Sequence, residues 1–143
     1  MNILVIHGPN LNMLGKRDEK LYGTFSLDDL YGEVSDYFEN HEFSFFQSNH
    51  EGELIDVIQH AEEENYDALL INPGAYTHTS IAIRDALELI SIPKVEVHLS
   101  NIDQREDFRK TDYIKDVCHE RFMGKKIDSY IEAIKFIENL VLS

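Results

Sequence analysis

Short apolar runs with the composition of β-strands alternate along this chain with longer segments whose apolar residues recur at helical spacing. The strand-like runs cover residues 2–7, 42–48, 67–72, 94–99 and 116–122. Most of them are followed by a segment with an apolar period near 3.6 residues. This alternation is typical of right-handed β-α-β crossovers, which align the strands in parallel and cover both sheet faces with helices. We therefore predict an α/β fold with a parallel sheet between two helical layers.

Four helices are expected between and after these strands, around residues 27–38, 54–61, 81–90 and 127–141. Ser26 and Asp29 form a variant of the capping box at the start of the first helix. The run 116–122 carries more charge than a central strand usually does, so we place it at a sheet edge. Five parallel strands favour the flavodoxin-like order 2-1-3-4-5, and residues 1–143 are expected to form one domain.

The charge balance excludes some partners. The chain has 13 Lys and Arg against 27 Asp and Glu, a formal net charge of −14, which repels nucleic-acid phosphates and anionic membranes. An anionic substrate would therefore need a local cluster of arginines. The single cysteine, Cys118, cannot form an internal disulfide, and the chain has neither a basic signal-peptide start nor an apolar run near ~20 residues. We expect a soluble, cytoplasmic protein.

The carboxyl ends of three strands should meet where the winding of the sheet reverses, which is where such folds bind ligands. The sequences there are HGPNLN, NPGAYTHTS and EVHLSN. NPGAYTHTS offers Asn72, Tyr76 and His78 before a helix N-terminus capped by Thr79 or Ser80, a suitable place for an anion. The alternative interpretation is a plain Pro-Gly turn followed by a capped helix.

Glu96 and His98 are two residues apart on an otherwise apolar strand, so their side chains share a face and can touch. A carboxylate beside an imidazole fixes its tautomer and raises its pKa. His98 would then keep a proton at neutral pH and act as a general acid. A polar pair whose two side chains only hydrogen-bond to each other, without a catalytic role, explains this pattern equally well. Ser100 and Asn101 follow with backbone N–H groups that could receive a carboxylate.

Two further stretches carry polar residues of interest. DQREDFRK places Arg105 and Arg109 at i,i+4 on one face of an expected short helix, and a solvated helix remains the alternative for Arg105. HGPNLNMLGKRDEKLYG, residues 7–23, follows the first strand and contains almost nothing that would build a helix core.

Together, GPNLNMLGKRDEKLYG, NPGAYTHTS, EVHLSN and REDFR, in this order and at these strand ends, closely resemble the type II 3-dehydroquinate dehydratases, or type II dehydroquinases. The resemblance runs from about residue 3 to residue 138, and four spaced motifs are far more specific than one. It implies a flavodoxin-like lyase that eliminates water anti from 3-dehydroquinate through an enolate, without a cofactor, to give 3-dehydroshikimate. That step serves aromatic amino acid biosynthesis through the shikimate pathway, or quinate catabolism. The resemblance also implies a homododecamer built as a tetramer of trimers.

The resemblance gives the long first loop a role. It implies that Tyr22 is the base that removes the proton alpha to the ketone, that Arg17 makes this possible, and that Asn10 holds a water against the enolate oxygen. Residues 16–23 would form a lid over the site.

The resemblance also assigns the proton donor and a contact between subunits. His98, oriented by Glu96, resembles the acid that protonates the departing hydroxyl. Asp85 resembles the carboxylate that reaches into a neighbouring subunit's site, which would link trimer contact to activity.

Substrate binding is assigned in the same way. Asn72, with the backbone N–H groups of Leu99 and Ser100, resembles the site for the substrate carboxylate. His78 and Arg109 resemble the pair that binds substrate hydroxyls.

A tyrosine base requires strong electrostatic help. An ordinary tyrosine has a pKa of ~10, and about 4 kcal/mol of preference for the phenolate would lower it to about 7. One guanidinium about 4 Å away, at an effective dielectric constant near 20, supplies roughly that amount before desolvation is subtracted. A second arginine, Arg105 or Arg109, would make the phenolate comfortably accessible. A closed lid would strengthen these interactions by excluding water.

The chain departs from the family pattern at two places. The first loop reads RDEKLYG where the family commonly has Arg-Glu-Pro before the tyrosine, so it lacks a rigidifying proline. The fifth strand is usually apolar and glycine-rich, whereas CHERFMGKK is charged.

Three other classes of protein compete with this interpretation. A flavodoxin-like domain that binds flavin or nucleotide would need a phosphate-binding first loop, and HGPNLNMLG has no Ser, Thr or Gly-x-Gly-x-x-Gly pattern. A metal hydrolase could use His7, His78 and His98, although no His-x-His pair supports it. A receiver domain needs an aspartate where this chain has Asn72.

Overall fold

A five-stranded parallel sheet forms the centre of the computed structural model, which describes residues 1–142. The strands are β1 (Asn2–His7), β2 (Glu42–Gln47), β3 (Ala68–Asn72), β4 (Lys94–Val97) and β5 (Glu120–Phe122). Their order is β2-β1-β3-β4-β5, and each neighbouring pair is parallel. The predicted fold class and strand order are therefore confirmed.

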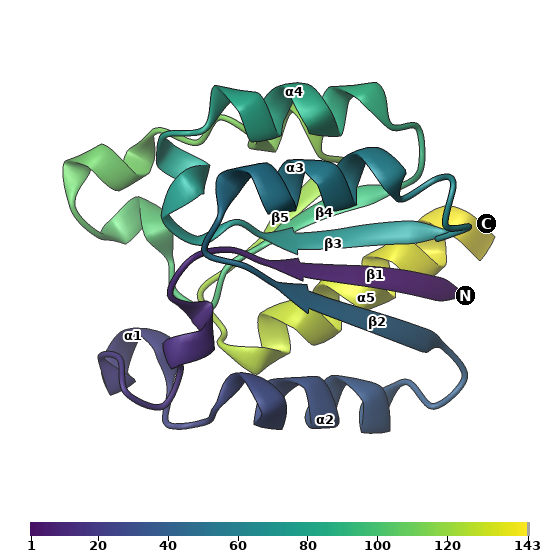
Figure 1. Ribbon diagram of the computed structural model, residues 1–143. Coiled ribbons are helices and arrows are strands. Elements are labelled where there is room, and N and C mark those ends of the chain that lie inside the picture. Colours follow the sequence, from purple (N-terminus) through teal and green to yellow (C-terminus); the bar gives the residue numbers. More distant parts are fainter. Residues whose placement is uncertain (143) are drawn as a thin grey trace.

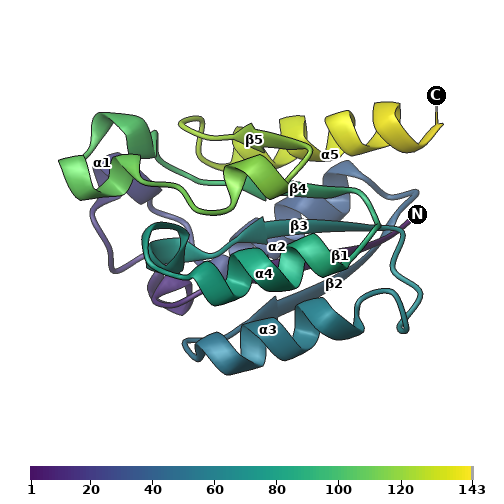
Figure 2. The same cartoon turned by 90° about the horizontal axis from the view of Figure 1, so that it is seen from above.

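Four helices cover the two faces of the sheet (Figures 1 and 2). Helices α2 (Leu27–Tyr37) and α5 (Ile127–Leu142) lie on one face, and α3 (Glu51–His60) and α4 (Ile81–Leu89) lie on the other. The capping box at the start of α2 is formed as predicted.

Successive residues of the central strands are buried in opposite layers. In β1, Ile3 and Val5 belong to the core under α2 and α5, while Leu4 and Ile6 belong to the core under α3 and α4. A strand that is buried on both faces needs apolar residues at every position, which explains the unbroken apolar run ILVI, residues 3–6. The sheet is therefore a rigid base for the loops at its carboxyl end.

The fifth strand is shorter than its sequence pattern predicts. Residues 116–122 were expected to be extended, but only Glu120–Phe122 pair with β4, at the edge of the sheet. Residues Lys115–Val117 instead form a 3₁₀ turn. Strand β5 has a sheet partner on one side only. Charged residues can be accommodated in such an edge strand.

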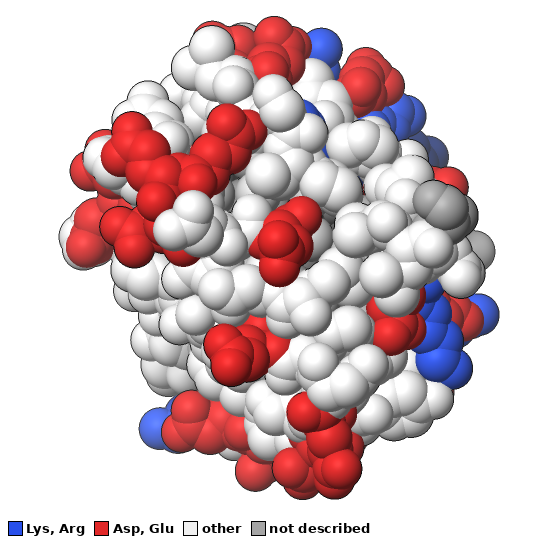
Figure 3. Space-filling view, turned by 90° about the vertical axis from the view of Figure 1, so that its right-hand side faces the viewer, with Lys and Arg blue, Asp and Glu red and all other residues white. Residues whose placement is uncertain are grey.

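Short helical turns make up most of the loops at the carboxyl end of the sheet. They are η1 (Leu11–Met13), α1 (Glu19–Tyr22), η2 (Gly74–His78), η3 (Ile102–Gln104) and η4 (Asp107–Lys110). At the opposite end, where the strands begin, acidic side chains are much more prominent than basic ones (Figure 3). Within residues 1–142, no helix has both the length and the apolar character needed to cross a membrane.

Candidate active site

A cavity of about 110 Å³ opens beyond the carboxyl ends of β1, β3 and β4, where the winding of the sheet reverses. The predicted site residues that line it are Asn10, Arg17, Tyr22, Asn72, His78, His98, Leu99, Ser100 and Arg109. Arg105 lines it as well. Glu96 does not line the cavity but contacts His98, and Asp85 is exposed on α4, away from the cavity of its own chain.

The loops after β1 and β3 approach one another closely at Gly8. Its backbone N–H donates to the carbonyl oxygen of Asn72 over 2.8 Å. A Cβ atom at Gly8 would lie only 2.1 Å from the carbonyl oxygen of Pro73, so no larger residue fits without moving the backbone. This approach brings Asn10 and Asn72 to the same cavity.

Two arginines converge on the hydroxyl of Tyr22. Its oxygen lies 2.8 Å from Nη2 of Arg17 and 2.6 Å from Nη1 of Arg105. The guanidinium carbon of Arg17 also lies 3.7 Å from the centre of the Tyr22 ring. Helix α1 ends at Tyr22, because Gly23 has a φ of 86° that suits glycine. The sequence pattern did not predict this short helix.

Arg105 and Arg109 have separate roles in the structure. They were expected on one face of a single helix, but this expectation is wrong, because the extended backbone of Arg105 separates η3 from η4. Nε of Arg109 pairs with Glu106 at 2.7 Å, while the Arg105 side chain is only 11 % exposed and turns to Tyr22. The alternative of a solvated helix is therefore wrong for Arg105.

Asn72 is held in one orientation by two hydrogen bonds. Its Oδ1 accepts from the backbone N–H of Gly74 over 3.1 Å, and its Nδ2 donates to the hydroxyl of Tyr130 over 3.0 Å. One Nδ2 hydrogen is therefore left for the cavity. His78 is held by its Nδ1, which lies 2.7 Å from the carbonyl oxygen of Thr111.

His7 is a buried structural residue beneath the cavity. Its Nε2 lies 2.8 Å from the hydroxyl of Tyr130, and its Nδ1 lies 3.4 Å from that of Tyr31. Burial lowers the pKa of His7 to about 3 and raises that of Tyr130, so a neutral imidazole accepts the phenol hydrogen. Within residues 1–142, His7, His78 and His98 do not form a group with ligand atoms close enough for one metal ion.

Glu96 and His98 touch, as the sequence predicts. Nε2 of His98 lies 2.5 Å from Oε2 of Glu96, and both residues are buried. The expectation that Glu96 raises the pKa of His98 is wrong, because burial lowers the pKa of His98 and raises that of Glu96. For a pair buried this deeply, the free-energy cost of removing water from the two charged forms exceeds the electrostatic attraction between them. The pair therefore consists of a carboxylic acid and a neutral imidazole.

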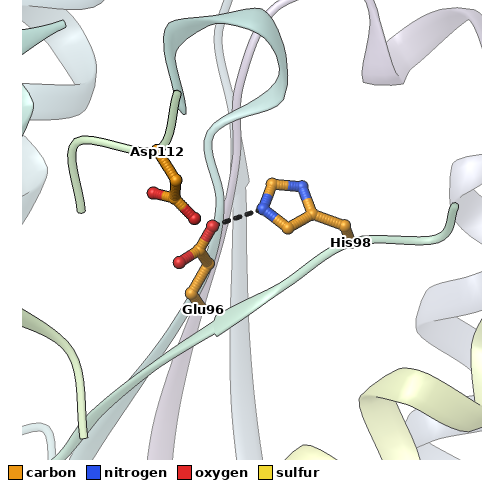
Figure 4. A group of neighbouring side chains, drawn as sticks. All are labelled: Glu96, His98 and Asp112. Atoms are coloured by element: carbon orange, nitrogen blue, oxygen red, sulfur yellow. Dashed lines mark hydrogen bonds and ion pairs between the residues drawn. The ribbon is translucent and has the colours of Figure 1, made fainter. Parts of the chain in front are cut away.

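Asp112 and Arg121 complete this cluster and were not among the predicted site residues. Glu96, His98 and Asp112 are the only group of His, Cys, Asp and Glu side chains in residues 1–142 with donor atoms close enough for one ion, all within 4.8 Å (Figure 4). The direct contact between Glu96 and His98 is that of two groups sharing a proton. Arg121 lies beside Glu96 in the β4–β5 pairing, which the sequence alone does not reveal.

Comparisons with known proteins agree with this geometry. Residues 1–138 match the family model described as dehydroquinase class II. The 3-dehydroquinate dehydratase of Thermotoga petrophila is 48 % identical over 140 residues, covering 96 % of this chain and 95 % of that protein. The enzyme of the same name from Clostridium beijerinckii is 51 % identical over 140 residues, covering 96 % of each. The crystal structure of a type II dehydroquinase from Butyrivibrio crossotus superimposes with a TM-score of 0.94 at 46 % identity, covering 96 % of this chain and 97 % of the other.

Proposed function

The chain belongs to the class II dehydroquinases, and on this premise we propose that its cavity dehydrates 3-dehydroquinate with Tyr22 as the base and His98 as the acid. The product is 3-dehydroshikimate, and the reaction is a lyase step of the shikimate pathway. The same chemistry would also serve quinate catabolism.

The observation that carries this proposal is the pair of guanidinium groups on the Tyr22 oxygen. Arg17 and Arg105 both donate to it, at 2.8 and 2.6 Å. A phenolate accepts such charged hydrogen bonds more strongly than a phenol does. Each cation near 4 Å contributes roughly 4 kcal/mol at an effective dielectric constant near 20, before desolvation is subtracted. In the proposed reaction, this oxygen removes the proton alpha to the substrate ketone while both guanidinium groups contact it.

Asn10 supports the enolate that forms when this proton leaves. It lines the cavity and has left-handed backbone angles, with a φ of 68°. Its backbone N–H donates to Asn49 over 3.0 Å, which fixes the turn while the Asn10 side chain remains available. In the proposed reaction, that side chain holds a water against the enolate oxygen.

His98 completes the elimination by protonating the departing hydroxyl. Its Nε2 is engaged by Glu96, so Nδ1 is the ring nitrogen that can act on a bound molecule. Because the imidazole is neutral, the proton given away is that of a neutral N–H group, and the hydrogen bond to Glu96 sets the tautomer. General acid–base groups of this kind typically contribute roughly 10²- to 10⁴-fold in rate.

The remaining groups of the cavity bind the substrate. Asn72, with the backbone N–H groups of Leu99 and Ser100, receives its carboxylate, and His78 and Arg109 bind its hydroxyls. The arginines at the cavity overcome locally the repulsion that a chain of net charge −14 exerts on an anionic substrate. This chemistry calls for no metal or organic cofactor.

Assembly and location complete the proposal. The protein acts in the cytoplasm as a homo-oligomer, a dodecamer built as a tetramer of trimers. Asp85, exposed on α4, reaches into the site of a neighbouring subunit. Its position away from the cavity of its own chain is consistent with this role.

A direct assay tests the reaction itself. Purified protein, with a chelator and no added metal, is mixed with 3-dehydroquinate, and the ultraviolet absorbance of the conjugated enone product is followed. We expect absorbance to rise in proportion to enzyme concentration. A folded and assembled protein that produces no enone would contradict the proposed function.

A further inference from the structure

A buried ion pair lies behind Glu96 and His98, and no step proposed above uses it. The Asp112 side chain is fully buried, and its Oδ2 lies 3.1 Å from Nη1 of Arg121. Its Oδ1 accepts hydrogen bonds from the backbone N–H groups of Ile114 and Lys115, at 2.9 and 3.1 Å. Three donors therefore fix both the position and the charge of this carboxylate.

The Asp112 carboxylate faces that of Glu96 (Figure 4). Two ionised carboxylates do not share a buried site, so one of them carries a proton. Asp112 has three donors, whereas Oε1 of Glu96 is buried and has no hydrogen-bond partner within residues 1–142. The geometry therefore assigns the charge to Asp112 and the proton to Glu96.

The pKa shifts of Glu96 and Asp112 agree with this assignment of the proton and the charge. Burial, followed by the neighbouring Asp112, raises the pKa of Glu96. Burial alone would raise the pKa of Asp112, but its contact with the Glu96 carboxyl and its hydrogen bonds with the Ile114 N–H and with Arg121 lower it below its ordinary value. Glu96 as an acid beside a neutral His98 holds as many protons as a carboxylate beside an imidazolium would. The pair can therefore act as an acid although the imidazole is neutral.

We propose that Asp112 is a positioning residue for the dehydration, because its fixed negative charge keeps on Glu96 the proton that His98 needs. This inference rests on the proposed function of His98. When Nδ1 of His98 gives its proton to the departing hydroxyl, that N–H bond breaks and water forms. The Oε2–H bond of Glu96 then breaks as its proton moves to Nε2, which leaves Glu96 as a carboxylate.

The charge on Asp112 also favours the return of the site to its starting protonation state. After the elimination, Tyr22 carries the proton taken from substrate, and Glu96 and Asp112 are two adjacent carboxylates. Their repulsion favours return of the Nε2 proton of His98 to Glu96 while Nδ1 takes up one proton from solvent and Tyr22 releases one to solvent. No oxidant, reductant or further reactant enters this cycle.

The test follows from the groups that surround the pair. The charged and titratable side chains that face Glu96 or His98 are His78, Asp103, Arg105, Asp112, Cys118 and Arg121. Only a negative charge in contact with Glu96 should strongly resist loss of its proton. The alkaline limb of the profile of kcat against pH, where the pair loses that proton, is therefore the readout.

Asp112→Asn removes the charge while retaining an oxygen for the two backbone donors. We expect its alkaline limb to move to lower pH by roughly one to three units. Asp103→Asn is the matched control, because Asp103 pairs with the same Arg121 at 2.8 Å but is 44 % exposed and raises the pKa of Glu96 less than Asp112 does. Its limb should stay close to that of wild type. An Asp112→Asn limb that coincides with wild type overturns the inference.

Infrared spectroscopy provides a second readout that does not require Asp112→Asn to fold. Wild-type protein at neutral pH should show a protonated carboxyl band that disappears in Glu96→Gln. Absence of that band overturns the inference. Failure of the proposed function of His98 would differ, because His98→Ala and Glu96→Gln would then both turn over like wild type, and failure of the dehydration itself would leave wild type without turnover.

Discussion

The hydroxyl oxygen of Tyr22 lies 2.6 Å from Nη1 of Arg105, although 83 residues separate the two in the chain. Tyr22 comes from the loop after β1 and Arg105 from the turns after β4. The contact joins the proposed lid, residues 16–23, to the opposite side of the cavity. Positive charge at the proposed base is thus assembled from two separate segments of the chain.

Removing Arg105 should reduce catalysis more than binding. We expect Arg105→Ala to lower kcat by about 10²- to 10³-fold, as Arg17→Ala should, because each guanidinium stabilises the phenolate by up to about 4 kcal/mol. Arg109→Ala should mainly raise KM, since Arg109 pairs with Glu106 and not with Tyr22. Steady-state kinetics of the three variants checks this. A greater loss of kcat in Arg109→Ala than in Arg105→Ala would contradict the assignment.

The sequence was sufficient to predict the fold because its signals are local and repeated. The apolar runs of β1 and β3 are what a strand buried on both faces requires, and the capping box of Ser26 and Asp29 marks the start of α2. Once the strand order is known, the carboxyl ends of β1, β3 and β4 must meet. The predicted cavity residues came together for that reason.

The cluster of Asp112 and Arg121 behind His98 could not be predicted from such local signals. Arg121 faces Glu96 only through the register of β4 and β5, and Asp112 reaches it from an irregular loop without periodicity. The protonation of His98 was also mispredicted, because spacing along a strand gives contact but not depth of burial. Arg105 turned away from Arg109 because residues 102–110 fold as two 3₁₀ turns instead of one helix.

Tyr130→Phe tests how Asn72 is oriented. Loss of the hydroxyl removes the acceptor of Nδ2 and the donor to His7, so the Asn72 amide keeps only one of the two hydrogen bonds that orient it. We expect KM for 3-dehydroquinate to rise by about tenfold, equivalent to ~1.4 kcal/mol, with a smaller change in kcat. Asn72→Ala should raise KM at least as much. A Tyr130→Phe enzyme whose kcat falls while KM is unchanged would show that the network does not act through the carboxylate site.

His7 should make folding stability dependent on pH. Burial lowers the pKa of His7 from its ordinary 6.5 to about 3 in the folded chain, so the unfolded chain binds more protons between these limits. The contribution of His7 is therefore complete above pH 6.5 and is lost as pH falls toward 3, by up to about 1.4 kcal/mol per pH unit.

Urea unfolding of wild type and His7→Gln across this pH range measures that contribution. Other groups, including His98 and Glu96, titrate equally in both proteins, so the difference in unfolding free energy isolates His7. We expect the difference to shrink as pH falls below 6.5. A difference that is constant with pH would mean that His7 is not held neutral by the fold.

Mixed assemblies test whether Asp85 acts across subunits. Asp85→Ala should lower activity although its own cavity is unchanged, and Tyr22→Phe should keep only a small residual activity. In hybrids made by coexpression, a site can combine an intact Tyr22 from one subunit with an intact Asp85 from its neighbour. We therefore expect hybrids to be more active than the average of the two parents. Activity equal to the average of the two parents would place Asp85 outside the neighbouring site.

The most direct test of the account is the turnover of Tyr22→Phe, measured by enone absorbance at saturating 3-dehydroquinate. The phenylalanine ring preserves the shape of the lid but provides no oxygen for Arg17 and Arg105. We predict that kcat falls by roughly 10²- to 10⁴-fold while circular dichroism and assembly match wild type. A folded Tyr22→Phe enzyme that turns over at the wild-type rate would contradict the proposal that Tyr22 removes the substrate proton.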